Sequence, residues 1–344
     1  MLKIFLLSLF FQINLIFDKI FYFMYLNKMH IYQWIVPFII FPAINFISLY
    51  FFVIYSKYKN KPGNNISHKH LCILALFDVC YDLLYTISIP KMSLVTYTIV
   101  GKISYLILMV TSYYFLKRRY LYTHFIGVIF CLTGVFITFA KPEQQKEDGF
   151  IYIFLFLIGI FIQSISSVYK EYFVKNIDDL DIFYMNWHIN GWELLWSCIF
   201  FFTIFIKEIN PYNVTQSNIN TYFNDAFECQ FVSCKYSLLF LLLSQVTTVF
   251  GILIAYKIVK DYSSMAIDLL ITFNGPLFLS VMYFFIKNKI INLNETENNS
   301  YNLHLVDYIS IVITFIGSII YFLKKEYTYQ NQSNKETLIS NSGL

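Results

Sequence analysis

Two aspartates four residues apart, Asp78 and Asp82, lie within an apolar stretch of the sequence. On a helix this spacing puts both carboxyl groups on one face. Two carboxyl groups that are close together in apolar surroundings should not both be ionised, so at least one should hold a proton near neutral pH. The pair therefore predicts proton binding. The alternative is that one aspartate pairs with a lysine of another apolar stretch while the other reaches an interface.

Several other polar residues also lie in apolar stretches, where an ionisable group is costly unless it faces a cavity or a partner. Each of them singly is best explained by a contact between helices, but as a set they favour a polar cavity for a solute and protons. The residues predicted to line this cavity are Asp18, Lys19, Asp78, Asp82, Lys102, Glu171, Asn190, Glu193, Asp268 and Asn274. Gly275 and Pro276 follow directly and predict a break in a helix, because Pro has no N–H and leaves carbonyl groups free.

Motifs for catalysis are missing from the sequence. It contains no H-E-x-x-H, G-x-S-x-G or Walker A motif, and no Cys/His spacing typical of a metal site. We therefore expect neither an enzyme nor a metal site nor an ATP-driven pump, and no cofactor other than a proton gradient. Arg118 and Arg119 are the only arginines, so the chain offers no arginine-rich patch for nucleic acid.

The elements that hold these residues must be strongly apolar. Of the 344 residues, 58% are apolar and 13% charged, against about 25% charged in an ordinary soluble domain. A soluble protein of this length cannot bury so much apolar surface. The composition excludes a cytoplasmic enzyme, a disordered chain and a secreted disulfide scaffold, and it predicts an all-α polytopic membrane protein.

Ten apolar stretches are long enough to cross a hydrocarbon core of about 30 Å, which needs about 20 helical residues. Met1–Phe17 resembles the start of a signal peptide, but no small-x-small cleavage site follows, so we interpret it as part of the first span. The predicted transmembrane helices are 3–26, 32–55, 69–89, 93–115, 122–140, 150–170, 182–206, 236–258, 264–286 and 304–323.

Lys and Arg residues concentrate in the loops on one side of these spans, most clearly in Ser56–His70 and Lys117–Arg119. By the positive-inside rule, this puts both termini in the cytosol. The one long loop, 207–235, then lies on the lumenal side, where Cys229 and Cys234 can form a disulfide, although their spacing does not require one. Sequons for lumenal glycosylation begin at Asn213, Asn294 and Asn298.

An internal repeat relates the two parts of the chain. Ser93–Lys117 resembles Ser263–Lys287 without a gap, both ending in Tyr-x-Phe-x-Lys, and Gly127–Lys141 resembles Ser310–Lys324 with a glycine in common. The alternative is chance similarity between apolar helices.

This repeat predicts a first half over 1–141 and a second over 142–325, which includes the lumenal loop, followed by a polar cytosolic tail over 326–344. Each half holds five spans. An odd number makes the halves cross in opposite directions, an architecture of many secondary transporters.

Short motifs along the chain resemble the chloroquine resistance transporter (CRT) family. Asp18-Lys19-Ile-Phe followed by Leu26-Asn27-Lys28 is similar to the family's N-K-I-F-x4-L-N-K, with Asp18 in place of Asn. Leu76–Cys80 is similar to its L-L-D-A-C. The other similar segments, in the family's order, are Val168–Lys175, Pro211–Asn213, Phe227–Cys229, Tyr262–Met265, Asn274–Pro276 and Gly317–Tyr321.

The resemblance implies the drug/metabolite transporter fold, with ten helices in two inverted five-helix repeats. It also implies a digestive-vacuole or lysosome-like membrane and export of basic or peptide-like solutes to the cytosol along the proton gradient. Quinoline drugs are carried by some family variants, and Lys19 falls on the lysine known for drug selectivity. Lys102, Gly251 and Asp268 depart from the family pattern, so drug transport is not carried over, and the lumenal loop keeps two of four cysteines.

We therefore predict a proton-coupled secondary transporter that exports amino acids, peptides or related small solutes, cationic or drug-like ones included, from an acidic vacuole to the cytosol. Its partners would be the solute, protons and the lipid bilayer, and we expect a monomer. One alternative is a thiol- or glutathione-type exporter, because Lys19 and Lys102 suit an anionic solute. Another is a receptor or scaffold whose intramembrane charges are structural pairs.

Overall fold

The computed structural model describes residues 2–28, 35–58, 67–88, 100–101, 103–139, 150–177, 181–205, 214–215, 217–267, 270–271, 305–322 and 327–328. Nearly all of this described chain is helical. The longer helices are α1 (Leu2–Lys28), α2 (Phe41–Tyr58), α3 (His68–Ser88), α5 (Ser104–Leu116), α6 (Tyr122–Phe139), α7 (Phe150–Asn176), α8 (Ile182–Phe201), α9 (Ile219–Glu228), α10 (Ser237–Asp261) and α13 (Leu305–Phe322). The short segments are η2 (Val36–Ile40), η4 (Phe202–Phe205), η5 (Cys229–Ser233), β1 (Arg118–Arg119) and β2 (Tyr327–Thr328).

Each predicted span overlaps a helical segment of the described chain. Most of 264–286 and part of 93–115 lie outside the described residues, as do a few end residues of other spans. One boundary is wrong: α7 continues to Asn176 instead of ending at residue 170. Among the described residues, four segments are long and apolar enough to cross a membrane, namely Phe38–Tyr55, His68–Ser88, Phe150–Asn176 and Ser237–Asp261.

The outer faces of the helices are apolar. Tyr114 is 72% exposed and Phe150 is 81% exposed, and many other large apolar side chains are exposed with them. A soluble monomer rarely shows apolar surface on this scale, whereas lipid contact accounts for it.

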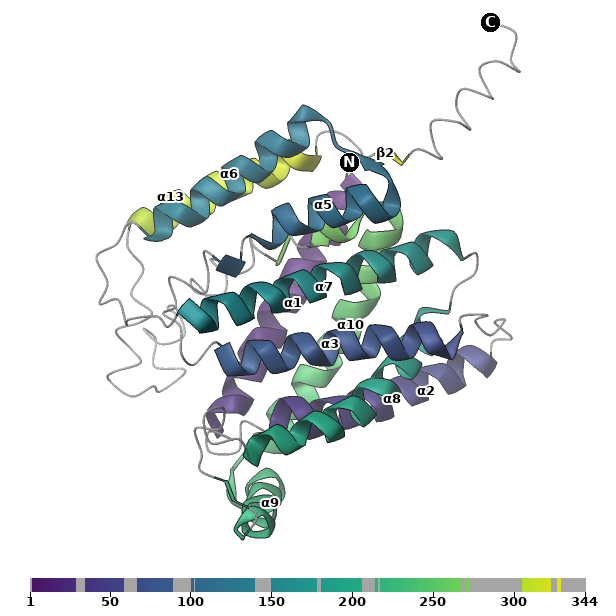
Figure 1. Ribbon diagram of the computed structural model, residues 1–344, viewed down its shortest axis with the longest axis vertical. Helices are drawn as coiled ribbons and strands as arrows, with labels where there is room; N and C mark the ends of the chain where they lie inside the picture. The colour runs from purple at the N-terminus through teal and green to yellow at the C-terminus, as the bar shows by residue number, and fades with distance from the viewer. Residues whose placement is uncertain are drawn as a thin grey trace, which may run out of the picture.

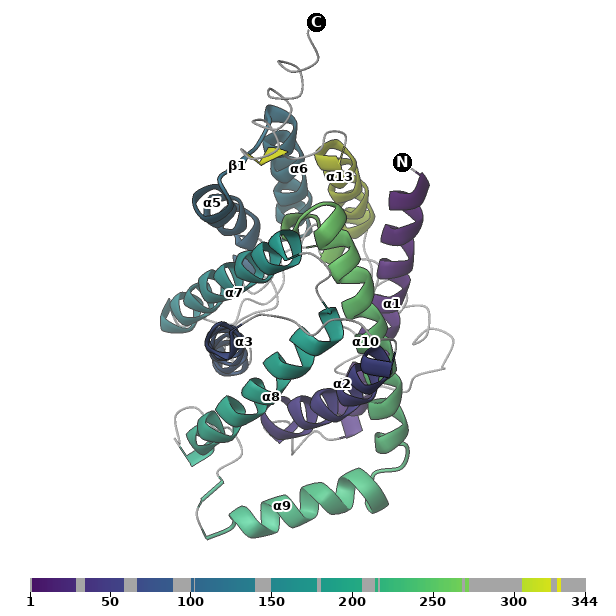
Figure 2. The same ribbon diagram turned by 90° about the vertical axis from the view of Figure 1, so that its right-hand side faces the viewer.

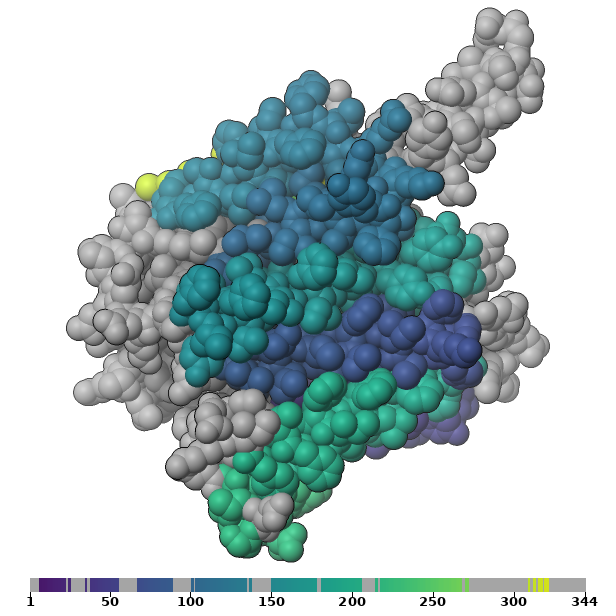
Figure 3. Space-filling model, in the orientation of Figure 1, coloured from purple at the N-terminus to yellow at the C-terminus, as the bar shows by residue number. Residues whose placement is uncertain are grey.

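Three helices form one face of the molecule, with α3 between α7 and α8 (Figures 1 and 3). Helix α2 packs along α8, and α5 packs along α7. Figure 2 shows α1 and α10 together on the opposite side of the molecule from α3 and α5. Every polar residue considered below lies on one of these helices or at its end.

Two helix starts are fixed by short polar side chains. Asp181 precedes α8 and accepts hydrogen bonds from the N–H groups of Phe183 (3.0 Å) and Tyr184 (3.2 Å). Ser263 precedes the helical turn after α10, and its Oγ accepts from the N–H of Ala266 at 3.2 Å. Such caps satisfy N–H groups that have no partner inside the helix.

Helices α6 and α13 cross at two glycines. A Cβ built on Gly127 would lie 2.7 Å from the carbonyl oxygen of Gly317, and a Cβ on Gly317 would lie 2.7 Å from that of Gly127. The two backbones can approach this closely only because neither position carries a side chain. Strand β1 precedes α6, β2 follows α13, and the strands pair with each other, so the two helices run antiparallel.

The predicted lumenal loop 207–235 contains α9, which lies across one end of the bundle (Figure 2). Its buried side chains Tyr222 and Ala226 pack against Phe201 and Ile204, at the end of α8 and in η4. Cys229 and Cys234 form the disulfide that the sequence permits.

Next to this disulfide, Tyr25 of α1 donates a buried hydrogen bond of 2.8 Å to Oε1 of Gln230. The loop is therefore tied to α1 as well as to α8.

Candidate functional site

A lysine and an aspartate of neighbouring helices form an ion pair inside the bundle. Nζ of Lys170, on α7, lies 2.5 Å from Oδ2 of Asp78, on α3. Ser166, one turn before Lys170, donates a hydrogen bond of 2.7 Å to Oδ1 of Asp78. Both carboxylate oxygens of Asp78 are thus bound by side chains of α7. This agrees with the alternative given above, in which one aspartate of the Asp78 and Asp82 pair binds a lysine of another apolar stretch.

Two further carboxyl groups lie within electrostatic range of this pair. Glu193, on α8, interacts with Asp78 and Lys170, and so does Asp82, one turn after Asp78. The Asp82 side chain is exposed, and its charge also acts on Tyr22 of α1. We call Asp78, Asp82, Lys170 and Glu193 the Lys170 cluster. It contains three acids and one base.

Side chains of α8 and α10 complete the surroundings of the Lys170 cluster. The hydroxyl of Tyr256, on α10, donates to Oδ1 of Asn186 at 3.0 Å, and this ring lies within electrostatic range of Lys170. Asn190, a predicted cavity residue, is 7% exposed and donates to the carbonyl oxygen of Asn186 at 2.9 Å. Asn190 lies one turn before Glu193 but is bound to its own helix.

A second polar group joins Asp18 of α1 to α10. Oδ1 of Asp18 accepts hydrogen bonds from the hydroxyl groups of Ser244 (3.2 Å), Thr247 (3.1 Å) and Thr248 (2.9 Å). The three donors share one face of α10 because they are spaced i, i+3 and i+4. Lys19, the next residue of α1, is half-buried, and among the described residues it has no ion-pair partner within 4.0 Å.

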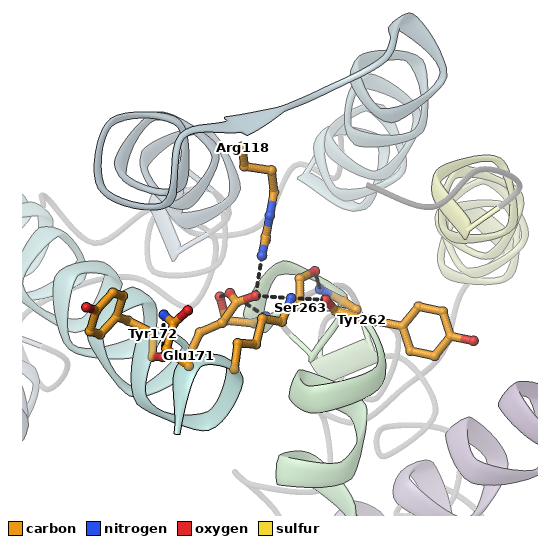
Figure 4. Close-up of polar contacts among 9 residues, drawn as sticks. Arg118, Glu171, Tyr172, Tyr262 and Ser263 are labelled. Atoms are coloured by element: carbon orange, nitrogen blue, oxygen red, sulfur yellow. Dashed lines mark hydrogen bonds and ion pairs between the residues drawn. The ribbon is translucent and has the colours of Figure 1, made fainter. Parts of the chain in front are cut away.

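Glu171 lies apart from both groups, where the corner between α5 and α6 meets the end of α10 (Figure 4). Its carboxylate pairs with Arg118 and, at 2.7 Å, with Lys175. It also accepts hydrogen bonds from the N–H (3.0 Å) and Oγ (2.7 Å) of Ser264. We call Arg118, Glu171, Lys175 and Ser264 the Glu171 cluster.

The Glu171 cluster is sealed from solvent at its centre. Arg118 is 1% exposed and Glu171 is 0% exposed. Lys175 donates as well to the carbonyl oxygen of Tyr262. A carboxylate with this many donors is suited to holding three chain segments together rather than to binding a solute. Partial burial and then the Asp261 carboxylate raise the pKa of the nearby Tyr262 phenol, which therefore stays neutral.

The other predicted site residues lie outside the described part of the chain, and their roles stay predictions. They are Lys102, Asp268, Asn274, Gly275 and Pro276 in the spans, and Asn213, Asn294 and Asn298 in the loops. In the part that is described, no group of three or more His, Cys, Asp or Glu side chains is arranged to hold a metal.

A family model described as CRT-like, chloroquine-resistance transporter-like, matches residues 4–321. The chain belongs to the CRT-like family. This confirms the resemblance seen in the short motifs, and it implies a multi-pass membrane transporter rather than a class of enzyme.

Relatives with the CRT name cover most of the chain. The chloroquine resistance transporter of Plasmodium falciparum is 22% identical over 369 residues, which span 97% of this chain and 83% of that protein. The transporter of Plasmodium falciparum isolate 7G8 is 22% identical over 328 residues, 85% of this chain and 74% of that protein. Solute carrier family 35 member F2 of Mus musculus is 34% identical over 77 residues, 21% of this chain and 20% of that protein.

The sequence of this CRT-like chain points to the acidic site residues but not to most of the side chains that bind them. The spacing of Ser244, Thr247 and Thr248 marks a polar stripe on an apolar helix and could have been found. The burial of Arg118 could not be predicted in this way, because a basic residue between two helices normally faces water. The partners that the structure adds are Arg118, Ser166, Lys170, Lys175, Ser244, Thr247, Thr248 and Ser264.

Proposed function

We propose that this CRT-like protein is a proton-coupled secondary transporter that moves amino acids, short peptides or related small solutes from an acidic vacuole to the cytosol. In this proposal the proton gradient supplies the energy and no cofactor is needed. Both termini lie in the cytosol, and a monomer in the bilayer is sufficient. The vacuolar location and the direction rest on the resemblance to the CRT family.

The observation that carries the proposal is the charge balance of the Lys170 cluster. One ammonium group faces the carboxyl groups of Asp78, Asp82 and Glu193, and only Asp78 is in direct contact with it. Acids that face one another between apolar helices cannot all be ionised, so the cluster should hold exchangeable protons. Ionisable groups within transmembrane segments are typical of proton pathways in transporters.

The helix pairs support two inverted halves, as the proposal requires. Helix α1 packs antiparallel to α10, with Tyr25 near Leu241 and Phe11 near Ile258. Helix α7 packs antiparallel to α3 in the same manner, with Gly159 against Leu84. An inverted repeat relates the first span to the sixth and the third to the eighth, so it predicts that both pairs occur.

The glycine crossing of α6 and α13 adds to this support. The close contacts are symmetric: Gly127 approaches Gly317 and Tyr321, and Gly317 approaches Gly127 and Cys131 in the same way. A rotation that puts α6 on α13 therefore replaces Gly127 by Gly317 and Cys131 by Tyr321. This relation shifts the chain by 190 residues, whereas the sequence repeat predicts 183. The difference of seven residues is about two helical turns, so both shifts put the same faces together.

Flux into proteoliposomes tests the proposal. Uptake of labelled basic amino acids and short peptides should follow an imposed pH gradient and collapse when a protonophore removes the gradient. A neutral sugar serves as the control solute and should not accumulate. Flux that is zero, or equal with and without the gradient, for every amino acid and peptide would rule out this function.

Two observations favour alternative functions that the same experiment can test. A non-transporting receptor or scaffold would also need the paired charges of Asp78 and Glu171, and this alternative predicts no flux of any solute. Lys19 is half-buried without an ion-pair partner among the described residues, which would suit an anionic solute such as glutathione. Labelled glutathione therefore belongs in the solute panel.

A further inference from the structure

We infer that Asp18 of α1, together with Ser244, Thr247 and Thr248 of α10, forms a binding site for a monovalent cation such as sodium. Asp18 was predicted above as part of a solute and proton cavity. The inference goes further, because it gives this chain an ion site that is separate from the Lys170 cluster.

The ligand set is made of hard oxygen atoms. Three hydroxyl oxygens converge on one carboxylate oxygen, at 2.9, 3.1 and 3.2 Å. Carboxylate, hydroxyl and carbonyl oxygens are ligands for hard cations, whereas a softer transition metal would prefer His or Cys, neither of which belongs to this group.

The charge of the site matches one positive charge. Lys19 is the only basic group whose charge acts on Asp18 among the described residues, and its ammonium makes no ion pair with that carboxylate. A single carboxylate between apolar helices is stabilised by one bound cation. A divalent ion would leave an excess positive charge next to Lys19, so a monovalent ion is favoured.

The hydroxyl of Thr247 shows why a cation improves the arrangement. It has one proton but three possible acceptors, which are Asp18, the carbonyl oxygen of Ser244 at 2.8 Å and that of Leu243 at 3.1 Å. When the proton goes to a carbonyl of its own helix, the lone pairs of the hydroxyl face the carboxylate and repel it. A cation between the two oxygens turns this repulsion into coordination.

Gln245 lies on the same turn of α10 and supplies an independent observation. Its side chain is 3% exposed, and neither atom of its amide group has a hydrogen-bond partner among the described residues. Buried amide groups are rarely left in this state unless a water, an ion or a ligand binds them. The turn of α10 that carries the hydroxyl ligands therefore also carries a buried amide group without a partner among the described residues.

The position of the site gives the bound ion a mechanical role. Asp18 belongs to the first predicted half and the three hydroxyl groups belong to the second. An ion bound by both helices favours the arrangement in which α1 lies against α10. Because a proton can occupy the same carboxylate, acid pH should compete with sodium at Asp18.

Binding of radiolabelled sodium to the purified full-length protein is the direct test, and thermal unfolding is the second measurement. Sodium chloride should raise the unfolding midpoint relative to choline chloride at equal ionic strength, since a ligand of the native state stabilises it. Thr248→Val removes one hydroxyl and keeps the shape of the side chain. It should weaken sodium binding by about tenfold or more.

Thr133→Val is the matched control, because the Thr133 hydroxyl is exposed and donates to a carbonyl of its own helix. This variant should bind sodium as the wild type does. Equal midpoints in sodium and choline, with no saturable sodium binding, would overturn the inference and leave Asp18 as a proton site. The assay contains no solute, so a failure of the proposed transport function would not change its outcome.

Discussion

At the scale of single residues, the number of donors around each carboxylate distinguishes its role. Glu171 is fully buried and has two basic partners and two donors from Ser264, so its charge is already neutralised. Asp82 is exposed, and no basic side chain contacts it among the described residues. The first kind of surroundings suits a group that fixes chain segments, whereas proton exchange needs carboxyl groups that share too few basic partners, as the three acids of the Lys170 cluster do.

Asp78→Asn should reduce proton-dependent flux more than Asp82→Asn does. Asp78 is the only acid of the Lys170 cluster in contact with the lysine, so its loss frees Lys170 to neutralise Glu193 and removes exchangeable protons. Asp82→Asn leaves the ion pair intact. Initial rates in proteoliposomes with and without a pH gradient measure both variants. Wild-type coupling in Asp78→Asn would argue against a role of this cluster in proton transfer.

Glu171→Gln should destabilise the protein strongly and leave the pH dependence of any remaining flux unchanged. The variant leaves the guanidinium of Arg118 buried without a counter-charge, and breaking such a pair costs about 3–5 kcal/mol. Thermal unfolding in detergent measures the loss. The control is Lys257→Gln, which breaks an exposed pair with Asp261 at 3.2 Å and should cost about 0.3–0.5 kcal/mol. Similar midpoints for the two variants would contradict the structural role of Glu171.

At the scale of helices, the sequence predicted the elements well and their neighbours poorly. Runs of apolar residues define each span locally, so they could be found without the structure. The predicted end of α7, at residue 170, is too early because Lys170, Glu171 and Lys175 suggest a loop. In the structure their partners on α3, the α5–α6 corner and the turn after α10 let the helix continue.

The same reason limits the prediction of the site. Asp18, Asp78 and Glu193 stand out in the sequence, because charged residues are costly in an apolar span. Their partners Ser166 and Thr248 are 88 and 230 residues away, and only the packing of α3 on α7 and of α1 on α10 brings them together. Glu171 looks like the predicted cavity residues in the sequence but belongs to a separate cluster. The sequence cannot separate it from them, because its partner Arg118 is not recognisable as a buried residue.

Gly127→Ala should destabilise the pairing of α6 with α13. The new methyl group would lie 2.7 Å from the carbonyl oxygen of Gly317, so the helices must separate, and overpacking of this kind costs about 1–3 kcal/mol. Gly101→Ala is the control, since its methyl group would meet only Phe156, at 4.0 Å. Unfolding midpoints in detergent compare the two. If Gly127→Ala is no less stable than Gly101→Ala, the crossing is looser than described.

At the scale of the whole molecule, the two ends of α8 define opposite sides of the bundle. Near its start, the ring of His188 lies 4.7 Å from that of His68, at the start of α3. At its other end, Phe201 packs against α9. The sequon Asn65-Ile66-Ser67 directly precedes α3, whereas the sequon of Asn213 precedes α9. Since α8 spans the distance between them, the two sequons should lie on opposite sides of the membrane.

Glycosylation therefore tests the orientation of the whole chain. With both termini in the cytosol, Asn213 is lumenal and Asn65 is cytosolic, so Asn213→Gln should lower the glycosylated mass in a eukaryotic host while Asn65→Gln has no effect. A glycan lost in Asn65→Gln would mean the reverse orientation. An acceptor too close to the membrane is not modified, so protease access to a tag at the C-terminus provides the second measurement. In sealed vacuoles the tag should be cleaved from the outside, because β2 begins the tail beside the Lys117–Arg119 corner and both should face the cytosol.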